Sequence, residues 1–341
     1  MAVVIAGGDE IRQEVSSGLA DLESGAPTTP DTVHLWFSMT KIVTATAAMQ
    51  LAERGSLSLD DPVRRFVPEF PKPRNGWPEV LVRHLLSHSA GLANPVPVRW
   101  VHLADTPGRD PRSFARELLA RHKRLRFPAG TKAAYSNLGY IVLGEVIAAA
   151  AGMRYEDYVR KHILEPLSMG RTGFGYEGLG EDVATGYQRM LSPMTPLFRL
   201  LLPSGIMGRR AGRFVSFNRF CVDGAAYGGL IGPAREAARF MALHVNEGEL
   251  EGVRLLSADS VKEMQTIQAS ARKLQIGFGW FRRGKDAADR AEHLEHLGGG
   301  GGFWNMMRIY PGRRTGVLAM GNSTSYDHAS IARAAVSAAG E

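Results

Sequence analysis

One stretch decides how the sequence is interpreted: Phe37-Ser-Met-Thr-Lys-Ile-Val-Thr-Ala-Thr-Ala-Ala-Met-Gln-Leu-Ala-Glu-Arg54, followed by Gly55. Its spacing predicts a helix, and Gly55 is a natural C-cap. Ser38 and Lys41 are three residues apart, so they share one helical face and the amine can reach the hydroxyl. A serine hydroxyl becomes a nucleophile when a base takes its proton, and burial lowers the pKa of an amine enough for that role. Ser38 is therefore the candidate nucleophile and Lys41 its candidate base.

The Ser38–Lys41 pair is weak evidence alone, because the same spacing recurs at Ser270-Ala-Arg-Lys273, which we interpret as chance. A second element, Tyr135-Ser-Asn137, opens a predicted helix over residues 138–151. A tyrosine beside Lys41 would share its proton and act as general base and then as acid, and Asn137 would hold the lysine and a substrate carbonyl. The alternative is a core tyrosine followed by a capping asparagine.

The third element is His296-Leu-Gly298, which runs into the glycines at 299–302 and a predicted strand over residues 303–310. Glycines in an edge strand let a substrate approach the backbone closely. The N–H groups of Gly299 and Ser38 would together form an oxyanion hole. A strand rather than a helix follows the glycines, which disfavours a dinucleotide-binding loop, and a plain linker is the other alternative. Trp304 is the tryptophan that we expect to contact substrate.

The order of predicted elements favours an α+β fold. Strand-like segments lie at both chain ends and helical ones in the middle. We expect a discontinuous α/β domain, residues 1–61 and 225–341, whose antiparallel sheet is flanked by helices, with a mostly helical domain inserted at residues 62–224. Residues 190–226 lack clean periodicity and are interpreted as a long loop or lid over a cleft, with a surface excursion without a role as the alternative.

Bulk properties exclude several classes of function. The net charge is +7 over 341 residues, but the basic clusters at 121–126 and 209–213 lack interleaved stacking aromatics, so nucleic-acid binding is not expected. No stretch approaches the ~20 apolar residues of a membrane helix, so membrane insertion is not expected. The chain start lacks a basic region and a sufficiently long apolar run for a signal peptide, which favours a cytoplasmic location. The single cysteine, Cys221, excludes an intrachain disulfide.

Two histidine pairs have spacings that metal ligands also use. His84 and His88 are four residues apart, but the glutamate of an H-E-x-x-H motif is absent, and hydrogen bonding at a helix end is the favoured role. His293 and His296 are interpreted as polar strand residues. No metal and no organic cofactor are expected, and the sequence leaves the oligomeric state open.

The joint order of these motifs resembles the serine β-lactamase and penicillin-binding-protein superfamily, and more narrowly its class C-like branch of esterases, D-aminopeptidases and DD-peptidases. Further segments carry the resemblance: Leu57-Ser-Leu-Asp-Asp-Pro62, Arg83-His-Leu-Leu-Ser-His-Ser-Ala-Gly-Leu92, Pro166-Leu-Ser-Met169 and Gly228-Gly229-Leu230. The resemblance implies Ser38 as nucleophile, Lys41 and Tyr135 as the acid/base pair and Asn137 as a substrate-side partner. It also implies that His296 and Gly298 line the far wall of the cleft.

One departure from the family bears on the substrate. Penicillin-processing members usually carry a lysine where this chain has His296, and a histidine of ordinary pKa near ~6.5 is mostly neutral at pH 7. Losing that charge weakens recognition of a substrate carboxylate. We therefore expect a carboxylesterase that acts on small esters through an acyl-enzyme. The alternatives are a DD-peptidase, D-aminopeptidase or β-lactamase on the same machinery, with a small-molecule amide as substrate, and a catalytically silent binding protein.

Overall fold

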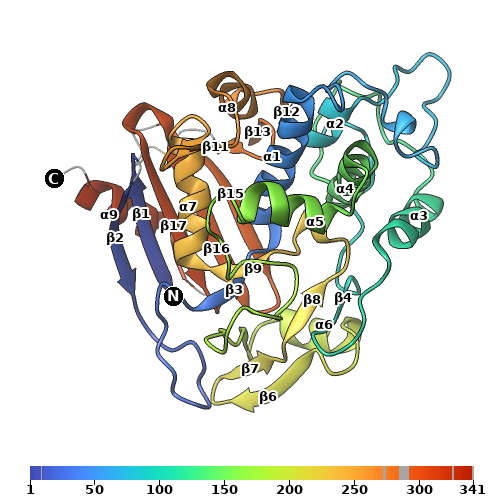
Figure 1. Ribbon diagram of the computed structural model, residues 1–341. Coiled ribbons are helices and arrows are strands. Elements are labelled where there is room, and N and C mark those ends of the chain that lie inside the picture. Colours follow the sequence, from blue (N-terminus) through green and yellow to red (C-terminus); the bar gives the residue numbers. More distant parts are fainter. Residues whose placement is uncertain (9, 272–273, 284–291, 325, 340–341) are drawn as a thin grey trace.

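The two ends of the chain meet in one antiparallel sheet (Figure 1). The first strand, β1 (Ala2–Gly7), pairs with the last, β17 (Thr315–Gly321), from Ala2 opposite Met320 to Gly7 opposite Thr315. The sheet has eight strands in the order β12-β13-β14-β15-β16-β17-β1-β2. Its other strands are β2 (Glu10–Ser16), β12 (Ala269–Ala271), β13 (Leu274–Ile276), β14 (Phe281–Arg283), β15 (Leu294–Gly300) and β16 (Phe303–Tyr310). The predicted α+β class and the sheet built from both chain ends are confirmed.

The computed structural model describes residues 1–8, 10–271, 274–283, 292–324 and 326–339. Its helices are α1 (Thr40–Glu53), α2 (Val82–Leu86), α3 (Pro111–Arg121), α4 (Asn137–Ala151), α5 (Tyr155–Val159), α6 (Met194–Leu201), α7 (Ala234–Val245), α8 (Ala258–Gln265) and α9 (His328–Ala339). Short helical turns are η1 (Phe37–Met39), η2 (Val63–Arg65), the π-helical η3 (Arg160–Leu164), η4 (Ala225–Tyr227) and η5 (Pro311–Arg313). Short strands pair outside the main sheet: β3 (Val33–Leu35) with β9 (Ile231–Pro233), β4 (Val101–Leu103) with β8 (Phe220–Val222), and β10 (Glu249–Leu250) with β11 (Val253–Arg254).

Helices cover the sheet on both faces. Helix α7 packs on β1 and β17 within the main core, whereas α9 packs on β16 and β17 over a separate small core that includes Ile5, Met306 and Ala332. Every residue of β17 is buried, as expected for an interior strand of a sheet that helices cover on both faces. Helix α1 lies against α4, α5 and α8, and every residue from Thr40 to Leu51 is buried.

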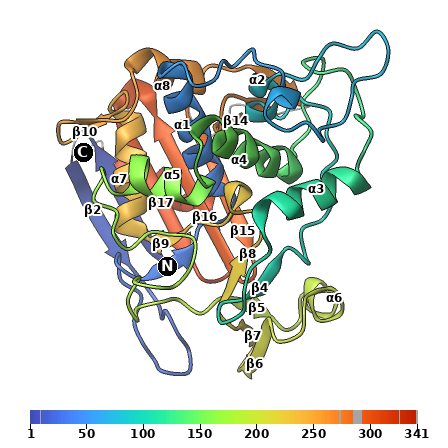
Figure 2. The ribbon, with the colours of Figure 1, turned by 45° about the vertical axis from the view of Figure 1, so that its right-hand side comes forward.

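Residues 62–224 hold α2 to α6, but they also contain strands. Within 190–226, where the sequence predicts a loop, the chain forms α6, β6 (Met207–Ala211), β7 (Phe214–Phe217) and β8. Strand β7 lies between β6 and β5 (Tyr187–Arg189) in a three-stranded sheet. The prediction of a structureless loop was wrong, because α6 is only eight residues long and contains Pro196, and the strands are shorter still, so no element is long enough to stand out as a periodic pattern. Figure 2 shows this region at the periphery of the molecule.

No single helix in the described part of the chain is long and apolar enough to cross a membrane. One pair of helical segments, Asn137–Ala151 with Tyr155–Leu164, passes the length and composition test only when joined across a bend of 73°. Most residues of the first of these segments are buried in the core.

Candidate active site

Ser38 lies in the turn η1, immediately before helix α1. The backbone of Phe37 has a φ of 49°, in the left-handed region that a bulky side chain rarely adopts. Trp36 N donates to the carbonyl of Leu230, and the Phe37 ring packs 6.3 Å from the rings of Phe220 and Phe303. The Trp36 hydrogen bond and the packing of the Phe37 ring therefore hold the strained backbone in place. This backbone conformation sets the direction in which the Ser38 side chain points.

The structure brings Ser38, Lys41, Tyr135 and Asn137 together. The Oγ atom of Ser38 lies 2.7 Å from the hydroxyl of Tyr135 and 3.2 Å from Nζ of Lys41. Lys41 Nζ also donates to Oδ1 of Asn137 at 2.9 Å and to the carbonyl of Tyr227 at 2.6 Å. Sequence reasoning found four of these five residues; it missed Tyr227, because a backbone carbonyl leaves no mark in side-chain identity.

Lys41 is fully buried, and its amine lies near the rings of Tyr135, Tyr140 and Tyr227, 4.9 to 5.5 Å from their centroids. Burial lowers the pKa of Lys41 well below 10.5, because desolvation disfavours the charged form. A neutral amine has two N–H donors and one lone pair. The two donors match Asn137 Oδ1 and the Tyr227 carbonyl, which leaves the lone pair for the hydroxyl proton of Ser38.

Tyr135 is half-buried, and desolvation raises the pKa of its hydroxyl above the ordinary value, so the phenol is protonated at neutral pH. Its ring packs 4.6 Å from the ring of His88, which also packs 4.9 Å from Tyr140. His88 is buried, and its Nδ1 accepts the backbone N–H of Ser136 at 3.2 Å. His88 thus makes a structural hydrogen bond just beyond the end of α2, as the sequence favours, and its partner is the Tyr135 segment, which the sequence did not indicate.

Helix α4 begins at Asn137 because Ser136 caps it. The Ser136 hydroxyl accepts the N–H of Gly139 at 3.0 Å and donates to the carbonyl of Ala93 at 2.8 Å. The backbone N–H of Asn137 donates to Oδ1 of Asn94. The cap is therefore Ser136 and not Asn137, as the alternative interpretation had it, and the Asn137 side chain is left to hold Lys41 as predicted.

The glycines of β15 let the strand lie directly against η1. A Cβ atom on Gly298 would lie 2.1 Å from the carbonyl oxygen of Trp36, and one on Gly300 would lie 2.6 Å from the Phe37 ring. These two residues and His296 alternate along the strand and face the same side. His296 is buried; its Nδ1 lies 2.6 Å from the carbonyl oxygen of Gly279, and its ring centroid is 6.4 Å from that of Tyr135.

Trp304 is not brought into this site. It pairs directly with Gly299 across the β15–β16 ladder, and cross-strand partners face the same side of a sheet. The indole lies against the position where a Gly299 Cβ would be, and its Nε1 donates to Nδ1 of His328 on α9 at 3.0 Å. The Trp304 side chain therefore packs on the α9 side of the sheet, away from Lys41.

A cavity of about 200 Å³ opens beside Ser38. Its polar lining side chains are Ser38, Asn137 and Tyr227, and none of the described residues that line it carries a charge. Aliphatic and aromatic side chains form most of the wall: Phe37, Pro97, Val98, Val101, Phe198, Leu202, Ile206, Phe217, Phe220 and Val222. Gly228 and Gly299 to Gly301 complete it, whereas His296 and Gly298 lie outside this lining. The region 190–226, which the sequence singled out, therefore contributes to the cavity, as does the segment that carries Pro97, Val98 and Val101.

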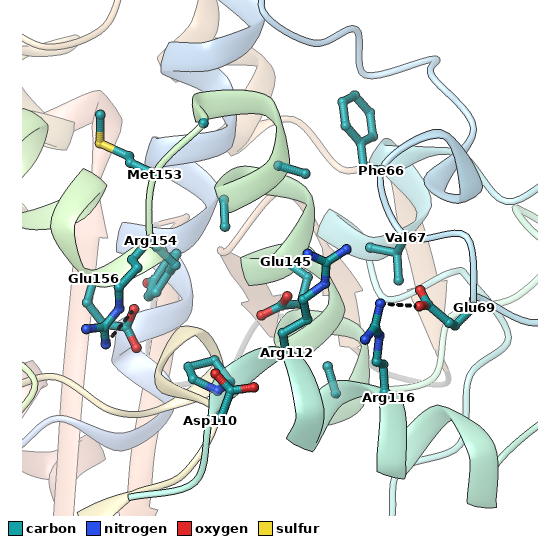
Figure 3. A pocket seen from close by; sticks show the side chains of 16 residues that line it. Phe66, Val67, Glu69, Asp110, Arg112, Arg116, Glu145, Met153, Arg154 and Glu156 are labelled. Carbon is teal, nitrogen blue, oxygen red and sulfur yellow. Dashed lines mark ion pairs between the residues drawn. The ribbon is translucent and has the colours of Figure 1, made fainter.

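A second hollow lies between α3, α4 and α5 (Figure 3). It shares no lining residue with the cavity at Ser38. Opposite charges alternate around it, and two of its arginines pair with carboxylates: Arg116 with Glu69 at 2.7 Å and Arg154 with Glu156 at 3.7 Å. Charged side chains of this hollow are thus paired with one another, whereas the cavity at Ser38 holds the candidate nucleophile. The cavity at Ser38 is therefore the better candidate for the active site.

The other sequence candidates have structural partners or lie outside the description. His84 Nδ1 accepts the N–H of Leu81 at the start of α2, and no group of three potential metal ligands occurs among the described residues. Cys221 is buried, and its raised pKa, caused by desolvation, keeps it a thiol. Lys273 of the second Ser-x-x-Lys lies outside the described residues.

Comparison with known proteins identifies the class. The Beta-lactamase family model matches residues 1–340, so the chain belongs to the Beta-lactamase family of serine hydrolases. Esterase EstB of Burkholderia gladioli is 34% identical over 186 residues, 50% of this chain and 46% of that protein. Penicillin-binding protein 4* of Bacillus subtilis (strain 168) is 24% identical over 343 residues, 96% of this chain and 69% of that protein.

A solved structure supports the same assignment. The octameric penicillin-binding protein homologue from Pyrococcus abyssi matches with a TM-score of 0.78 and 27% identity, over 98% of this chain and 72% of that chain. The family resemblance inferred from the motif order is thereby confirmed.

Proposed function

We propose that the protein is a carboxylesterase that cleaves small esters of apolar acids through an acyl-enzyme on Ser38. The observation that carries the proposal is the uncharged, apolar cavity beside the Ser38 hydroxyl. An apolar acyl or alcohol group gains free energy by leaving water for such a wall. A substrate carboxylate, such as that of a β-lactam or a peptide, would meet no cationic side chain among the described lining residues. Buried charge without a partner is strongly disfavoured.

In the proposed mechanism, Lys41 is the resting base. Ser38 Oγ attacks the ester carbonyl while its proton moves to Nζ of Lys41, which the lowered pKa of that amine favours. The N–H groups of Ser38 and Gly299 stabilise the oxyanion. The proton then reaches the leaving alcohol oxygen through the Tyr135 hydroxyl, and the carbon–oxygen bond to the alcohol breaks. Water attacks the acyl-enzyme by the reverse sequence of proton transfers and releases the acid.

Asn137 and Tyr227 have positioning roles in this mechanism. Their oxygens accept the two N–H groups of Lys41 and so direct its lone pair at Ser38. The protonated Tyr135 donates to Ser38 Oγ at rest, because its raised pKa disfavours the phenolate. Lys41 can act as a base only while it is neutral and its lone pair points at Ser38. The contacts with Asn137 and Tyr227 are therefore needed for the proton transfer from Ser38.

The test compares substrates and labels the nucleophile. We expect turnover of p-nitrophenyl butyrate to exceed that of nitrocefin and of a D-alanine anilide by at least about 100-fold in kcat/KM, a gap of roughly 2.7 kcal/mol. A fluorophosphonate probe should modify the peptide that carries Ser38. Comparable nitrocefin or anilide turnover would favour the β-lactamase or aminopeptidase alternative, and absence of any adduct on Ser38 would favour a silent binding protein.

Two serine variants separate catalysis from structure. Ser38→Ala should abolish labelling and ester hydrolysis with little change in the melting temperature. The matched control is Ser87→Ala, a buried serine whose hydroxyl bonds, among the described residues, to the carbonyl of Arg83 and the hydroxyl of Ser89. It should retain labelling and activity.

A further inference from the structure

Helix α6 and the turn before it expose an unusual number of large apolar side chains. Leu191 is fully exposed, Leu200 is 76% exposed, and Met194 and Leu197 are each about two-fifths exposed. These four make up half of the large exposed hydrophobic residues of the described chain, and they lie within ten consecutive positions. Such a concentration of exposed apolar surface marks an interaction site more often than chance exposure does.

The opposite side of α6 faces the cavity at Ser38. Phe198 and Leu202 line that cavity, together with Pro97 and Val98 of the neighbouring loop. The same loop is tied to the end of α6, because Arg99 Nε donates to the carbonyl of Leu201 at 3.2 Å. The exposed apolar face therefore lies on the outer side of the wall of the proposed substrate cavity.

The segment around α6 carries most of the net charge of the protein. Residues 183–222 contain six arginines, no lysine and no acidic residue, so they account for six of the seven net positive charges. All six are exposed: Arg189, Arg199, Arg209, Arg210, Arg213 and Arg219. Only Arg209 pairs with a carboxylate within the described part of the chain, at 3.7 Å from Glu23, and both partners are highly exposed. Figure 2 shows α6, β6 and β7 together at one corner of the molecule.

We propose that this surface, α6 with its preceding turn, its own Arg199 and the five arginines that flank it, docks on anionic phospholipid bilayers. Aliphatic side chains beside arginines suit the boundary between acyl chains and anionic headgroups, where short amphipathic helices lie in the plane of the membrane. Nothing in this arrangement spans the bilayer. Docking places the wall of the Ser38 cavity against the lipid, which is a source of apolar esters. Docking requires no catalysis, so vesicle binding tests it separately from the proposed esterase activity.

The first test is sedimentation with vesicles, performed on the full chain. We expect binding to vesicles of equal parts phosphatidylglycerol and phosphatidylcholine, and at least about tenfold weaker binding to phosphatidylcholine alone. Raising the salt concentration should weaken binding by screening the arginines. Ser38→Ala should bind as the wild type does. Equal binding to neutral and anionic vesicles, or no binding to either, would overturn the proposal.

The apolar contribution is tested by Leu191→Gln combined with Leu200→Gln. Both positions are highly exposed, so the fold should be preserved, which circular dichroism checks. We expect the affinity for anionic vesicles to fall about tenfold or more, because two leucines no longer leave water. The control is Val15→Gln combined with Leu19→Gln, exposed apolar residues near β2, which should bind as the wild type does. An equal loss in both double variants would contradict a specific docking surface.

The charge contribution is tested by Arg209→Gln combined with Arg213→Gln. Each basic residue near an anionic membrane changes affinity by about fivefold, so we expect a loss of about 25-fold. The control, Lys123→Gln combined with Arg124→Gln, removes the same charge from the other basic cluster and should have less than half that effect on a logarithmic scale. Equal losses would show that net charge alone attracts the protein, and would overturn the assignment to α6.

Discussion

The Nζ atom of Lys41 lies 2.6 Å from the carbonyl oxygen of Tyr227, nearer than to any other hydrogen-bond partner described for it. Its partners are an amide oxygen, a carbonyl and a hydroxyl, all of them neutral. A charged amine without a carboxylate is costly to bury, whereas a neutral one is satisfied by these groups. These three neutral partners therefore suit an uncharged amine, in agreement with the lowered pKa that burial causes for Lys41.

The protonation of Lys41 predicts a pH dependence of stability. Between the lowered pKa of the folded state and 10.5, the unfolded chain binds a proton at Lys41 that the folded chain does not. The free energy of unfolding should therefore rise with pH in this interval and level off above it. Lys41→Met should lose this rise, as measured by urea unfolding at about pH 8 and about pH 10. It should also lose about 10³-fold or more in kcat/KM.

Lys132→Met, at an exposed position, is the matched control for Lys41→Met. We expect it to leave both the ester hydrolysis rate and the pH dependence of unfolding close to the wild type. A Lys41→Met protein that keeps its activity would show that Ser38 has another base.

Gly298→Ala should disrupt both stability and activity. The added methyl group would lie 2.1 Å from the carbonyl oxygen of Trp36, and neither backbone segment can give way without moving Ser38. We expect a loss of about 1–3 kcal/mol in unfolding free energy and a larger relative fall in kcat than in the affinity for substrate. Gly312→Ala, where a Cβ meets open space, should change neither quantity. Wild-type turnover by Gly298→Ala would contradict the close approach of β15 to η1.

Two buried histidines predict loss of stability in acid. Burial lowers the pKa of His34 to about 4 and that of His244 to about 3. Below pH 6.5 these two histidines become protonated in the unfolded chain, whereas in the folded chain they stay neutral until the pH approaches the lowered pKa values. The free energy of unfolding should therefore fall as the pH falls toward these values. Urea unfolding at several pH values measures the slope, which should be smaller in His244→Gln. An unchanged slope in that variant would show that His244 is charged in the folded state.

Phe198→Ala should shift the ester preference toward longer acyl chains, because Phe198 forms part of the cavity wall. We expect the ratio of kcat/KM for octanoate over butyrate to rise about tenfold, since each additional buried methylene favours binding. Leu197→Ala, one residue away on the exposed side of α6, is the control and should keep the wild-type ratio. The same shift in both variants would place the acyl chain elsewhere.

Much of the catalytic arrangement could be predicted because its residues form ordered motifs. Ser38 and Lys41 are adjacent by helical spacing, and Tyr135 and Asn137 follow from the family resemblance. The carbonyl of Tyr227 was missed because any residue supplies a carbonyl. The sequence favours a structural hydrogen bond for His88, and only the tertiary fold reveals its packing against Tyr135.

Other parts of the site depended on information that the sequence does not display. The side on which Trp304 lies follows from its register opposite Gly299, and that register is set by the hairpin turn rather than by residue type. Helix α6 escaped prediction because it is only eight residues long and carries Pro196 near its start, so it is shorter than the window over which a helical period is recognised.

The left-handed backbone of Phe37 carries a cost in stability in the turn that positions Ser38. A bulky residue held there stores about 1–3 kcal/mol of strain that the rest of the fold must offset. Phe37→Gly would relieve this strain, because glycine adopts the left-handed geometry freely. The same change removes the ring that packs against Phe220 and Phe303, and losing such packing costs about 3–5 kcal/mol, so the strained phenylalanine is the more stable choice as well as the one that holds the Ser38 turn in place.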